Sequence, residues 1–319
     1  MTAIGVELVG TSRSVRPLAA MDVAITGASG LIGTELTRSL TAAGHRPIAL
    51  VRRSLSAGAD EITWNPSDGT IDAPSLEGVD ALVHLAGAGI GDKRWNAARK
   101  AVIRDSRVDG TALVATTLAG LDRPPSVFVS GSATGFYGSR GDTVLDESSP
   151  KGEGFLSDVV EAWERAAQPA IDAGIRTVFP RTGIVLSTEG GALKKQLPLF
   201  KLGLGGRFGS GDQYQSWISI DDEIAAIEWL IDSELSGPVN LTAPNPVTNR
   251  EFTETLGSVV RRPTLLPVPL FGPKLLFGGE LVEELLLTSQ RIEPTVLTES
   301  GFSFEHPTLE PALRALIGA

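Results

Sequence analysis

The chain has 319 residues, of which 42% are hydrophobic, and carries a formal net charge of −10 at pH 7. This acidic balance, with no basic stripe along the sequence, argues against nucleic acid as a partner. The absence of cysteine excludes disulfides, thiolate metal sites and a cysteine nucleophile.

Residues 1–20 are expected to be an N-terminal extension. They lack the apolar block of a secretory signal peptide, and Met21 stands directly before the first expected strand, so Met21 is an alternative start. No apolar run approaches the length of a membrane span, since the longest candidate, residues 265–287, contains three prolines, one lysine and three glutamates. We therefore expect a cytoplasmic protein with no membrane partner.

A glycine-rich loop joins the first expected strand, residues 22–26, to the first expected helix, residues 32–43. A strand that enters such a loop lets the backbone approach a pyrophosphate, which then binds the N–H groups at the helix N-terminus. The alternative is a loop that binds no ligand. We expect a dinucleotide site made of Thr26, Gly27, Ser29, Gly30, Leu31, Ile32 and Gly33.

The second expected strand, residues 47–51, ends in Arg52 and Arg53. An NAD site usually has an acidic residue here for the ribose 2′-hydroxyl, whereas an NADP site uses arginine for the 2′-phosphate. No Asp or Glu lies between Glu35 and Asp60, so we predict NADP(H) as the cofactor. The alternative is that both arginines are solvent-exposed side chains at the end of the strand and bind no cofactor.

Strand and helix patterns alternate from residue 21 to about residue 181, which predicts an α/β fold with a Rossmann doubly wound parallel sheet. Three small or apolar residues at the end of the third expected strand and just after it would line the cofactor crevice: Leu85, Ala86 and Gly87. The remaining elements of this half are strands at 80–85, 126–130 and 175–180, and helices at 93–119 and 155–173.

We assign residues 21–182 to the NADP-binding domain and residues 183–319 to a smaller C-terminal lobe on the substrate side. The last part of this lobe, about residues 248–317, is expected to form a small domain. Helices are predicted at 221–230, 251–261, 280–289 and 309–317, and loops at 190–191, 203–211 and 238–246.

Several of these segments resemble the extended short-chain dehydrogenase/reductase superfamily, which includes nucleotide-sugar epimerases. The shared segments are Thr26–Gly33, His84–Gly87 and Ser130–Gly138. Within that superfamily, the chain is most similar to an atypical epimerase-like family with a small extra C-terminal domain. That similarity rests on Lys93-Arg94-Trp95, Ser106-Arg107, Gly190-Gly191-Ala192-Leu193, Ser216-Trp217-Ile218, Arg262-Pro263 and Gly301-Phe302.

The resemblance implies a Tyr-x-x-x-Lys pair, in which tyrosine acts as acid or base and lysine lowers its pKa. In this chain the two positions fall near Leu156 and Val160, neither of which can transfer a proton. Relatives also carry Asn where this chain has Arg107. We expect Arg107 either to face the cleft and attract an anionic group, or to be a surface arginine paired with Asp105 or Asp109.

Three residues remain as candidates for the chemistry: Ser132, Tyr137 and Arg107, the last of which is also a candidate cofactor ligand. Ser132 either binds substrate or forms hydrogen bonds with backbone groups at the end of a strand. Tyr137 either acts as an acid or shapes the pocket. The three histidines, His45, His84 and His306, are far apart in the sequence, so we expect structural roles for them and no metal site.

These residues favour an NADP(H)-binding protein of the oxidoreductase-like or epimerase-like type, acting on a small, anionic or strongly polar substrate. The alternative is a non-catalytic, NADP(H)-dependent regulator, because members of the family that the chain resembles have been likened to cell-division factors. The sequence leaves open whether the protein forms a homodimer.

Overall fold

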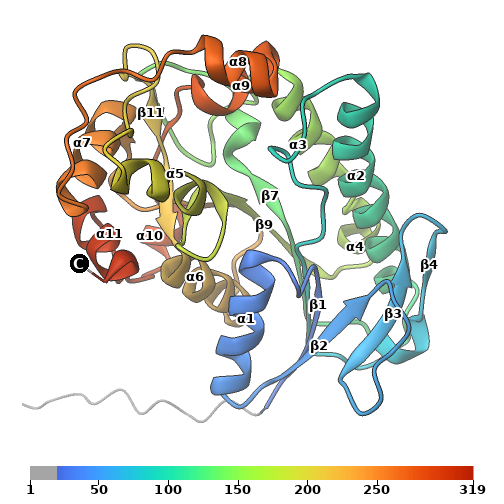
Figure 1. Cartoon of the computed structure of the whole chain (residues 1–319). Coiled ribbons are helices and arrows are strands. Elements are labelled where there is room, and N and C mark those ends of the chain that lie inside the picture. Colours follow the sequence, from blue (N-terminus) through green and yellow to red (C-terminus); the bar gives the residue numbers. More distant parts are fainter. Residues whose placement is uncertain (1–19, 319) are drawn as a thin grey trace, which may run out of the picture.

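The computed structural model describes residues 20–318, so the expected extension at residues 1–20 lies almost entirely outside the described part. Its centre is a twisted sheet in which the strand order is β13-β9-β6-β5-β1-β2-β3-β4, with β7 beside β9 (Figure 1). All pairs are parallel except β3 with β4. The strands are β1 (Asp22–Thr26), β2 (Arg46–Val51), β3 (Glu61–Asn65), β4 (Thr70–Ile71), β5 (Ala81–His84), β6 (Val127–Ser130), β7 (Ser132–Ala133), β9 (Arg176–Thr182) and β13 (Gly237–Leu241).

The chain leaves β1 toward one edge through β2 and β3, then returns to β5 and continues toward the other edge. This reversal is the switch point of a doubly wound sheet, where ligands bind outside the carboxyl ends of the strands. The predicted Rossmann α/β fold is confirmed.

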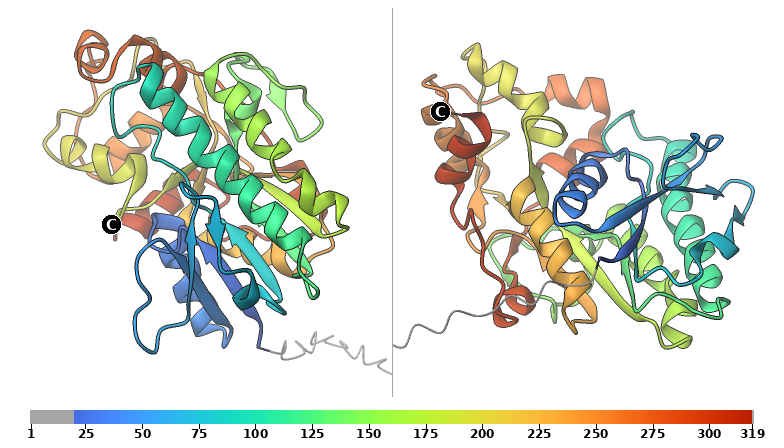
Figure 2. Two further views of the ribbon diagram at one scale, coloured as in Figure 1. Left: turned by 90° about the vertical axis from the view of Figure 1, so that its right-hand side faces the viewer. Right: turned by 90° about the horizontal axis from the view of Figure 1, so that it is seen from below.

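Helices cover both faces of the sheet, which explains why β5 and β6 are buried along their whole length (Figures 1 and 2). On one face, α1 (Leu31–Ala42) and α6 (Ile220–Asp232) pack their apolar side chains against Ile25, Val83 and Val129. The other face is covered by α2 (Ala97–Ala119), α3 (Phe155–Arg165) and α4 (Gln168–Asp172). Within the described residues, no helix is long and apolar enough to cross a membrane.

Four strands of the central sheet were missing from the sequence-based prediction, namely β3, β4, β7 and β13. β3 lies beside β2, and β13 occupies part of the segment 238–246, where we expected only a loop. Pro238 made that segment resemble a loop, but β13 is an edge strand and an edge position tolerates proline.

Two expected helices also have different bounds. The helix predicted at 93–119 begins only at Ala97, because the Asn96 side chain accepts a hydrogen bond from the Arg99 N–H and caps the first turn. The helix predicted at 155–173 is divided into α3 and α4. Pro169 explains the break, since a proline ring clashes with the carbonyl four residues earlier and cannot donate a helical hydrogen bond.

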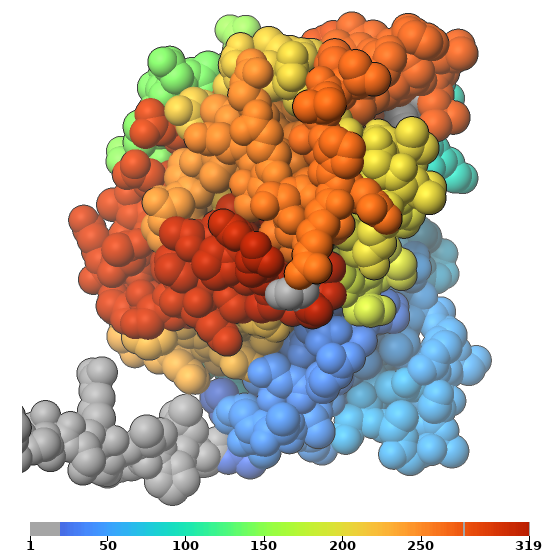
Figure 3. All heavy atoms as spheres, turned by 60° about the vertical axis from the view of Figure 1, so that its left-hand side comes forward, coloured from blue at the N-terminus to red at the C-terminus, as the bar shows by residue number. Residues whose placement is uncertain are grey.

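The second half of the chain has a core of its own around Leu193, Trp217, Phe252 and Leu313. Figure 3 shows its surface in yellow, orange and red above the blue N-terminal elements. It contains β10 (Ile184–Leu186), α5 (Gly191–Lys201), β11 (Tyr214–Gln215), β12 (Trp217–Ser219), β14 (Val247–Thr248), α7 (Asn249–Val259), α8 (Phe271–Phe277), α9 (Gly279–Leu286), β15 (Arg291–Ile292), α10 (Thr295–Glu299) and α11 (Leu309–Ile317). β15 pairs with the short β8 (Val144–Leu145).

The division at residues 182 and 183 stays a prediction. β9 ends at that boundary, yet α6 and β13 follow it in the chain and complete the large sheet and its cover. The second half therefore contributes both to its own core and to the core of the first half.

Gly33 is a position where only glycine fits. A Cβ atom there would lie 2.2 Å from the Gly27 carbonyl oxygen and 2.8 Å from the Ala28 Cα. We expect Gly33→Ala to destabilise the protein by about 1–3 kcal/mol, because the start of α1 would have to move off the loop. Chemical unfolding measures this, with Gly30→Ala as the control, since its Cβ would meet only the Gly27 oxygen at 3.2 Å. Equal stability of the two variants would contradict the packing described here.

Candidate functional site

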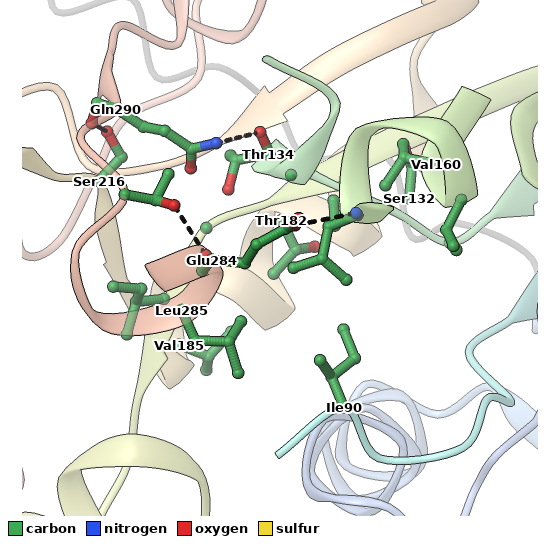
Figure 4. A pocket seen from close by; sticks show the side chains of 18 of the residues that line it. Ile90, Ser132, Thr134, Val160, Thr182, Val185, Ser216, Glu284, Leu285 and Gln290 are labelled. Atoms are coloured by element: carbon green, nitrogen blue, oxygen red, sulfur yellow. Dashed lines mark hydrogen bonds between the residues drawn. The ribbon is translucent and has the colours of Figure 1, made fainter. Parts of the chain in front are cut away.

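A cavity of about 840 Å³ lies at the carboxyl ends of the sheet strands, between the glycine loop and the second half of the chain. The first half contributes Gly27, Leu85, Ser132, Leu156 and others, and α9 and its neighbours close the opposite side. Figure 4 shows residues from several elements around it, among them Ile90, Val185 and Leu285. The cavity is thus at the edge of the sheet where the topology predicts a ligand.

The glycine loop opens the N-terminus of α1 into this cavity. Gly27 has φ +72°, a conformation that favours glycine, and Gly30 provides no side-chain cap for the helix. The unpaired N–H groups of the first turn, without an acidic neighbour, form a site suited to an anion. Five of the predicted loop residues line the cavity: Gly27, Gly30, Leu31, Ile32 and Gly33.

Thr26 has a different place from the one predicted. It is fully buried, and its Oγ1 accepts hydrogen bonds from the N–H groups of Leu85 (3.1 Å) and Ala86 (3.3 Å). The same oxygen lies 2.7 Å from Nδ1 of His84, whose pKa burial lowers to about 4. A neutral histidine and a threonine therefore hold the loop after β5 against β1.

The remaining predicted cofactor residues differ in whether they line the cavity. Leu85 lines the cavity, whereas Ser29, Ala86 and Gly87 are not part of its wall. Gly87 lies against the Arg107 guanidinium, since a Cβ on Gly87 would be 3.3 Å from the Arg107 Cζ.

The two arginines after β2 differ in their surroundings. Arg53 donates to the Glu61 carboxylate on β3, with 3.1 Å between Nη1 and Oε2, and this hydrogen bond is the main cause that lowers the pKa of Glu61. Arg52 is exposed and has no hydrogen-bond or ion-pair partner within residues 20–318. An acidic residue therefore does lie near the end of β2, but it comes from β3 and pairs with Arg53, leaving Arg52 available to a phosphate.

Arg107 lies inside the protein and lines the cavity, so the alternative of a surface arginine is wrong. Its Nη1 donates to the carbonyl oxygens of Ala88 and Ile103, both at 3.0 Å, and its guanidinium stacks on Trp163 at 5.1 Å. Burial lowers the pKa of Arg107 to about 10, which leaves it charged at pH 7. In the described part of the chain it has no carboxylate partner, so its charge is available to a negatively charged atom in the cavity.

Ser132 belongs to a network of buried polar side chains. Its hydroxyl donates to Oε1 of Glu164 at 2.6 Å, and Arg181 donates to both oxygens of Glu164 at 2.9 Å. Ser132 lines the cavity, whereas Glu164 and Arg181 stand behind it. The pair thus fixes the orientation of the serine hydroxyl.

Tyr137 lies at the far end of the same network and is fully buried. Its hydroxyl accepts from Arg181 at 3.1 Å and donates to Asn240 at 2.7 Å, and burial raises its pKa. It is not part of the cavity wall, so the structure gives it a positioning role and not the role of an acid that touches substrate.

Leu156 and Val160 both line the cavity from α3. Beside them lies Glu284 of α9, whose carboxylate accepts the N–H groups of Phe155 (2.8 Å) and Leu156 (3.0 Å) and so caps α3. Sequence reasoning missed Glu284, because 129 residues separate it from Phe155 and no local pattern marks it.

Glu223 is a buried carboxyl group next to the cavity. Its Oε1 is 2.8 Å from the hydroxyl of Thr182, which lines the cavity, and its Oε2 has no partner in the described part of the chain. Burial raises the pKa of Glu223 to about 8, so the folded protein holds this carboxyl in its neutral form at pH 7.

Because this pKa is higher in the folded state, the contribution of Glu223 to stability falls as pH rises from about 4.5 to 8, and then levels off. We expect Glu223→Gln to abolish this fall in stability with pH. Its free energy of unfolding should exceed that of wild type by on the order of 1–4 kcal/mol between pH 5 and 8.5, with the difference growing as pH rises. Urea unfolding at several pH values measures the difference, with Glu254→Gln on the exposed side of α7 as the control. Identical pH profiles for wild type and Glu223→Gln would contradict the assignment.

The sequence matches two known families. Residues 23–157 match the NAD dependent epimerase/dehydratase family, and residues 268–316 match a domain of unknown function, DUF1731. An epimerase family protein of Mycobacterium bovis is 46% identical over 292 residues, which cover 91% of this chain and 96% of the relative. The human epimerase family protein SDR39U1 is 34% identical over 301 residues, which cover 93% of this chain and all of that protein.

Solved structures give the same relationship. The crystal structure of human SDR39U1 with NADPH has a TM-score of 0.86 at 33% identity, covering 93% of this chain and 99% of that chain. A nucleoside-diphosphate sugar epimerase from Corynebacterium glutamicum has a TM-score of 0.77 at 38% identity, covering 94% of this chain and 59% of that chain.

These similarities extend over nearly the whole chain and include the C-terminal domain, as the resemblance in sequence indicated. The chain therefore belongs to the NAD dependent epimerase/dehydratase family, as an atypical short-chain dehydrogenase/reductase of the group that includes SDR39U1.

Proposed function

We propose that this protein binds NADPH in the cavity and catalyses hydride transfer to or from a carbonyl carbon. When bound, NADPH would supply a hydride that, with one proton from water, reduces a carbonyl group to an alcohol and leaves NADP⁺. The open N-terminus of α1 fits a pyrophosphate, and Arg52 fits a 2′-phosphate. The human relative solved with NADPH supports the same cofactor.

The observation that carries the catalytic proposal is the buried, charged Arg107 in the same cavity as the glycine loop. In a reduction, negative charge develops on the carbonyl oxygen, and a positioned cation stabilises it. Ser132 also lines the cavity, but its hydroxyl donates its hydrogen to Glu164, so Ser132 would face the substrate with its oxygen as a hydrogen-bond acceptor. Tyr137 and Asn240 would act only through Arg181.

Ordinary alcohol dehydrogenation or sugar epimerisation fits the site less well. Both need an effective acid or base, which typically contributes about 10²–10⁴-fold, and the apolar side chains of Leu156 and Val160 line the cavity near the positions where relatives carry one. We infer that catalysis here relies on electrostatic stabilisation more than on proton transfer.

The alternative is a non-catalytic NADPH-dependent regulator, for which a link to cell division remains a suggestion from family resemblance. The absence of a proton donor at Leu156 favours it. NADPH binding without turnover of any carbonyl compound would support the regulator over the enzyme. On composition we expect a cytoplasmic protein, although the relative from Arabidopsis thaliana is named as chloroplastic.

We expect NADPH to bind at least tenfold more tightly than NADH, because a charge-assisted arginine–phosphate contact contributes about 1.5–3 kcal/mol. Arg52→Ala should remove most of this preference. Arg53→Ala is the matched control and should change it less, since Arg53 already pairs with Glu61. Calorimetric titration with both cofactors measures the ratio. Equal affinity of the wild type for NADPH and NADH would overturn the NADP assignment.

Arg107→Ala is expected to reduce kcat/KM for a carbonyl substrate by about 10²–10³-fold, because removing one group that stabilises an oxyanion typically has an effect of this size. NADPH affinity should stay within a few-fold of wild type, because the proposal places Arg107 at the substrate oxygen. A screen of carbonyl compounds and nucleotide sugars, followed by NADPH absorbance, tests this with Ser132→Ala alongside. Rapid turnover of a nucleotide sugar that neither substitution affects would show that the reaction occurs elsewhere.

A further inference from the structure

The walls of the cavity carry apolar side chains from several elements, together with uncharged polar ones such as Thr134, Ser216 and Gln290. Ile90 from the loop after β5, Leu156 and Val160 from α3, Val185 from β10 and Leu285 from α9 all line it. Figure 4 shows Ile90, Val185 and Leu285 facing the open space from three different elements. Side chains from both halves of the chain thus contribute apolar surface to the cavity in which a substrate would lie beside the cofactor.

The charges on these walls are unevenly distributed. Among the described residues that line the cavity, Arg107 is the only basic one, whereas Glu153, Glu283 and Glu284 are acidic. A nucleoside diphosphate carries two negative charges, which a protein normally pairs with arginine or lysine. The walls offer no such pair of cations, because Arg107 is alone among the basic residues of the described part of the chain that line the cavity.

The acidic residues do not form a site for a cation either. Glu283 pairs with Lys274, with 2.7 Å between Nζ and Oε1, and both oxygens of Glu284 accept backbone N–H groups of α3. Among these acidic residues, only Glu153 has no hydrogen-bond or ion-pair partner in the part of the chain described, and its side chain is exposed to solvent. Apart from Arg107, the charged side chains on the walls are therefore paired or exposed, and none of them calls for a charged ligand.

We propose that the substrate is an uncharged carbonyl compound with an apolar body, and not a nucleoside diphosphate sugar. This inference rests on the hydride transfer proposed above. The apolar body would remove its surface from water against Ile90, Val185 and Leu285, which is favourable in proportion to the area buried. The carbonyl oxygen would be directed toward Arg107.

Under this assignment, Arg107 acts on the reacting oxygen and not on a charged group of the substrate. Its charge does not call for an anionic substrate, because the negative charge that it stabilises develops on the carbonyl oxygen during the reaction. Leu156 and Val160 then have a function of their own, since they replace polar catalytic side chains by apolar surface that contacts the substrate body.

Binding to the NADP⁺-loaded protein tests the proposal, because this form cannot reduce a ketone. The two probes are 2-octanone and UDP-glucose, titrated by calorimetry. We expect 2-octanone to bind at least tenfold more tightly than UDP-glucose. Leu285→Gln should weaken 2-octanone binding at least fivefold, because the substitution places a polar group of similar size on the apolar wall. Leu275→Gln is the control and should change nothing, since Leu275 is 77% exposed on α8 and does not line the cavity.

Tighter binding of UDP-glucose, or an equal loss of 2-octanone binding in both leucine variants, would overturn the proposed substrate class. NADPH oxidation separates this outcome from a failure of the proposed function. If 2-octanone binds as expected and Leu285→Gln weakens it, the substrate class stands even where no NADPH is oxidised, and the hydride transfer then fails. If UDP-glucose binds more tightly and is turned over with the cofactor, the hydride transfer stands and the substrate class fails.

Discussion

The buried ion pair between Glu164 and Arg181 is the interaction on which the centre of this molecule depends. Their side chains are 14% and 4% exposed, and the pair joins α3 to β9 through two hydrogen bonds of 2.9 Å. Ser132 and Tyr137 are both held by it, one toward the cavity and one toward β13. Removing one member of such a pair typically costs about 3–5 kcal/mol, because the other charge remains buried alone.

Arg107 and Arg181 show how the surroundings of a buried cation determine its role. Arg181 has a bidentate carboxylate partner and is stacked on Phe136, so its charge is satisfied within the protein. Arg107 has only carbonyl oxygens and an aromatic face, and it lines the cavity. The first arginine organises the site, and the second is available to a ligand.

The C-terminal domain completes the cavity and stabilises the helix that forms its wall. Glu284 caps α3 from α9, and Gln290 donates to the carbonyl oxygens of Thr134 and Gly138 at 2.9 and 3.0 Å. Because these contacts connect residues more than 120 positions apart, the shape of the substrate side depends on how the two halves pack. The apolar character of that side likewise comes from both halves.

The sequence by itself determined the central strands, the glycine loop, the acidic character and the lack of a proton donor near Leu156, because strand periodicity, glycine spacing and residue type are local properties. Only the tertiary structure decided which of two neighbouring arginines is available, since the partner of Arg53 comes from β3, a strand that the sequence-based prediction missed. It also decided that Tyr137 is buried, that Glu284 caps α3 and that β13 joins the sheet in spite of Pro238. Each of these depends on which distant segments meet at one edge or one helix end, and no pattern along the chain records that.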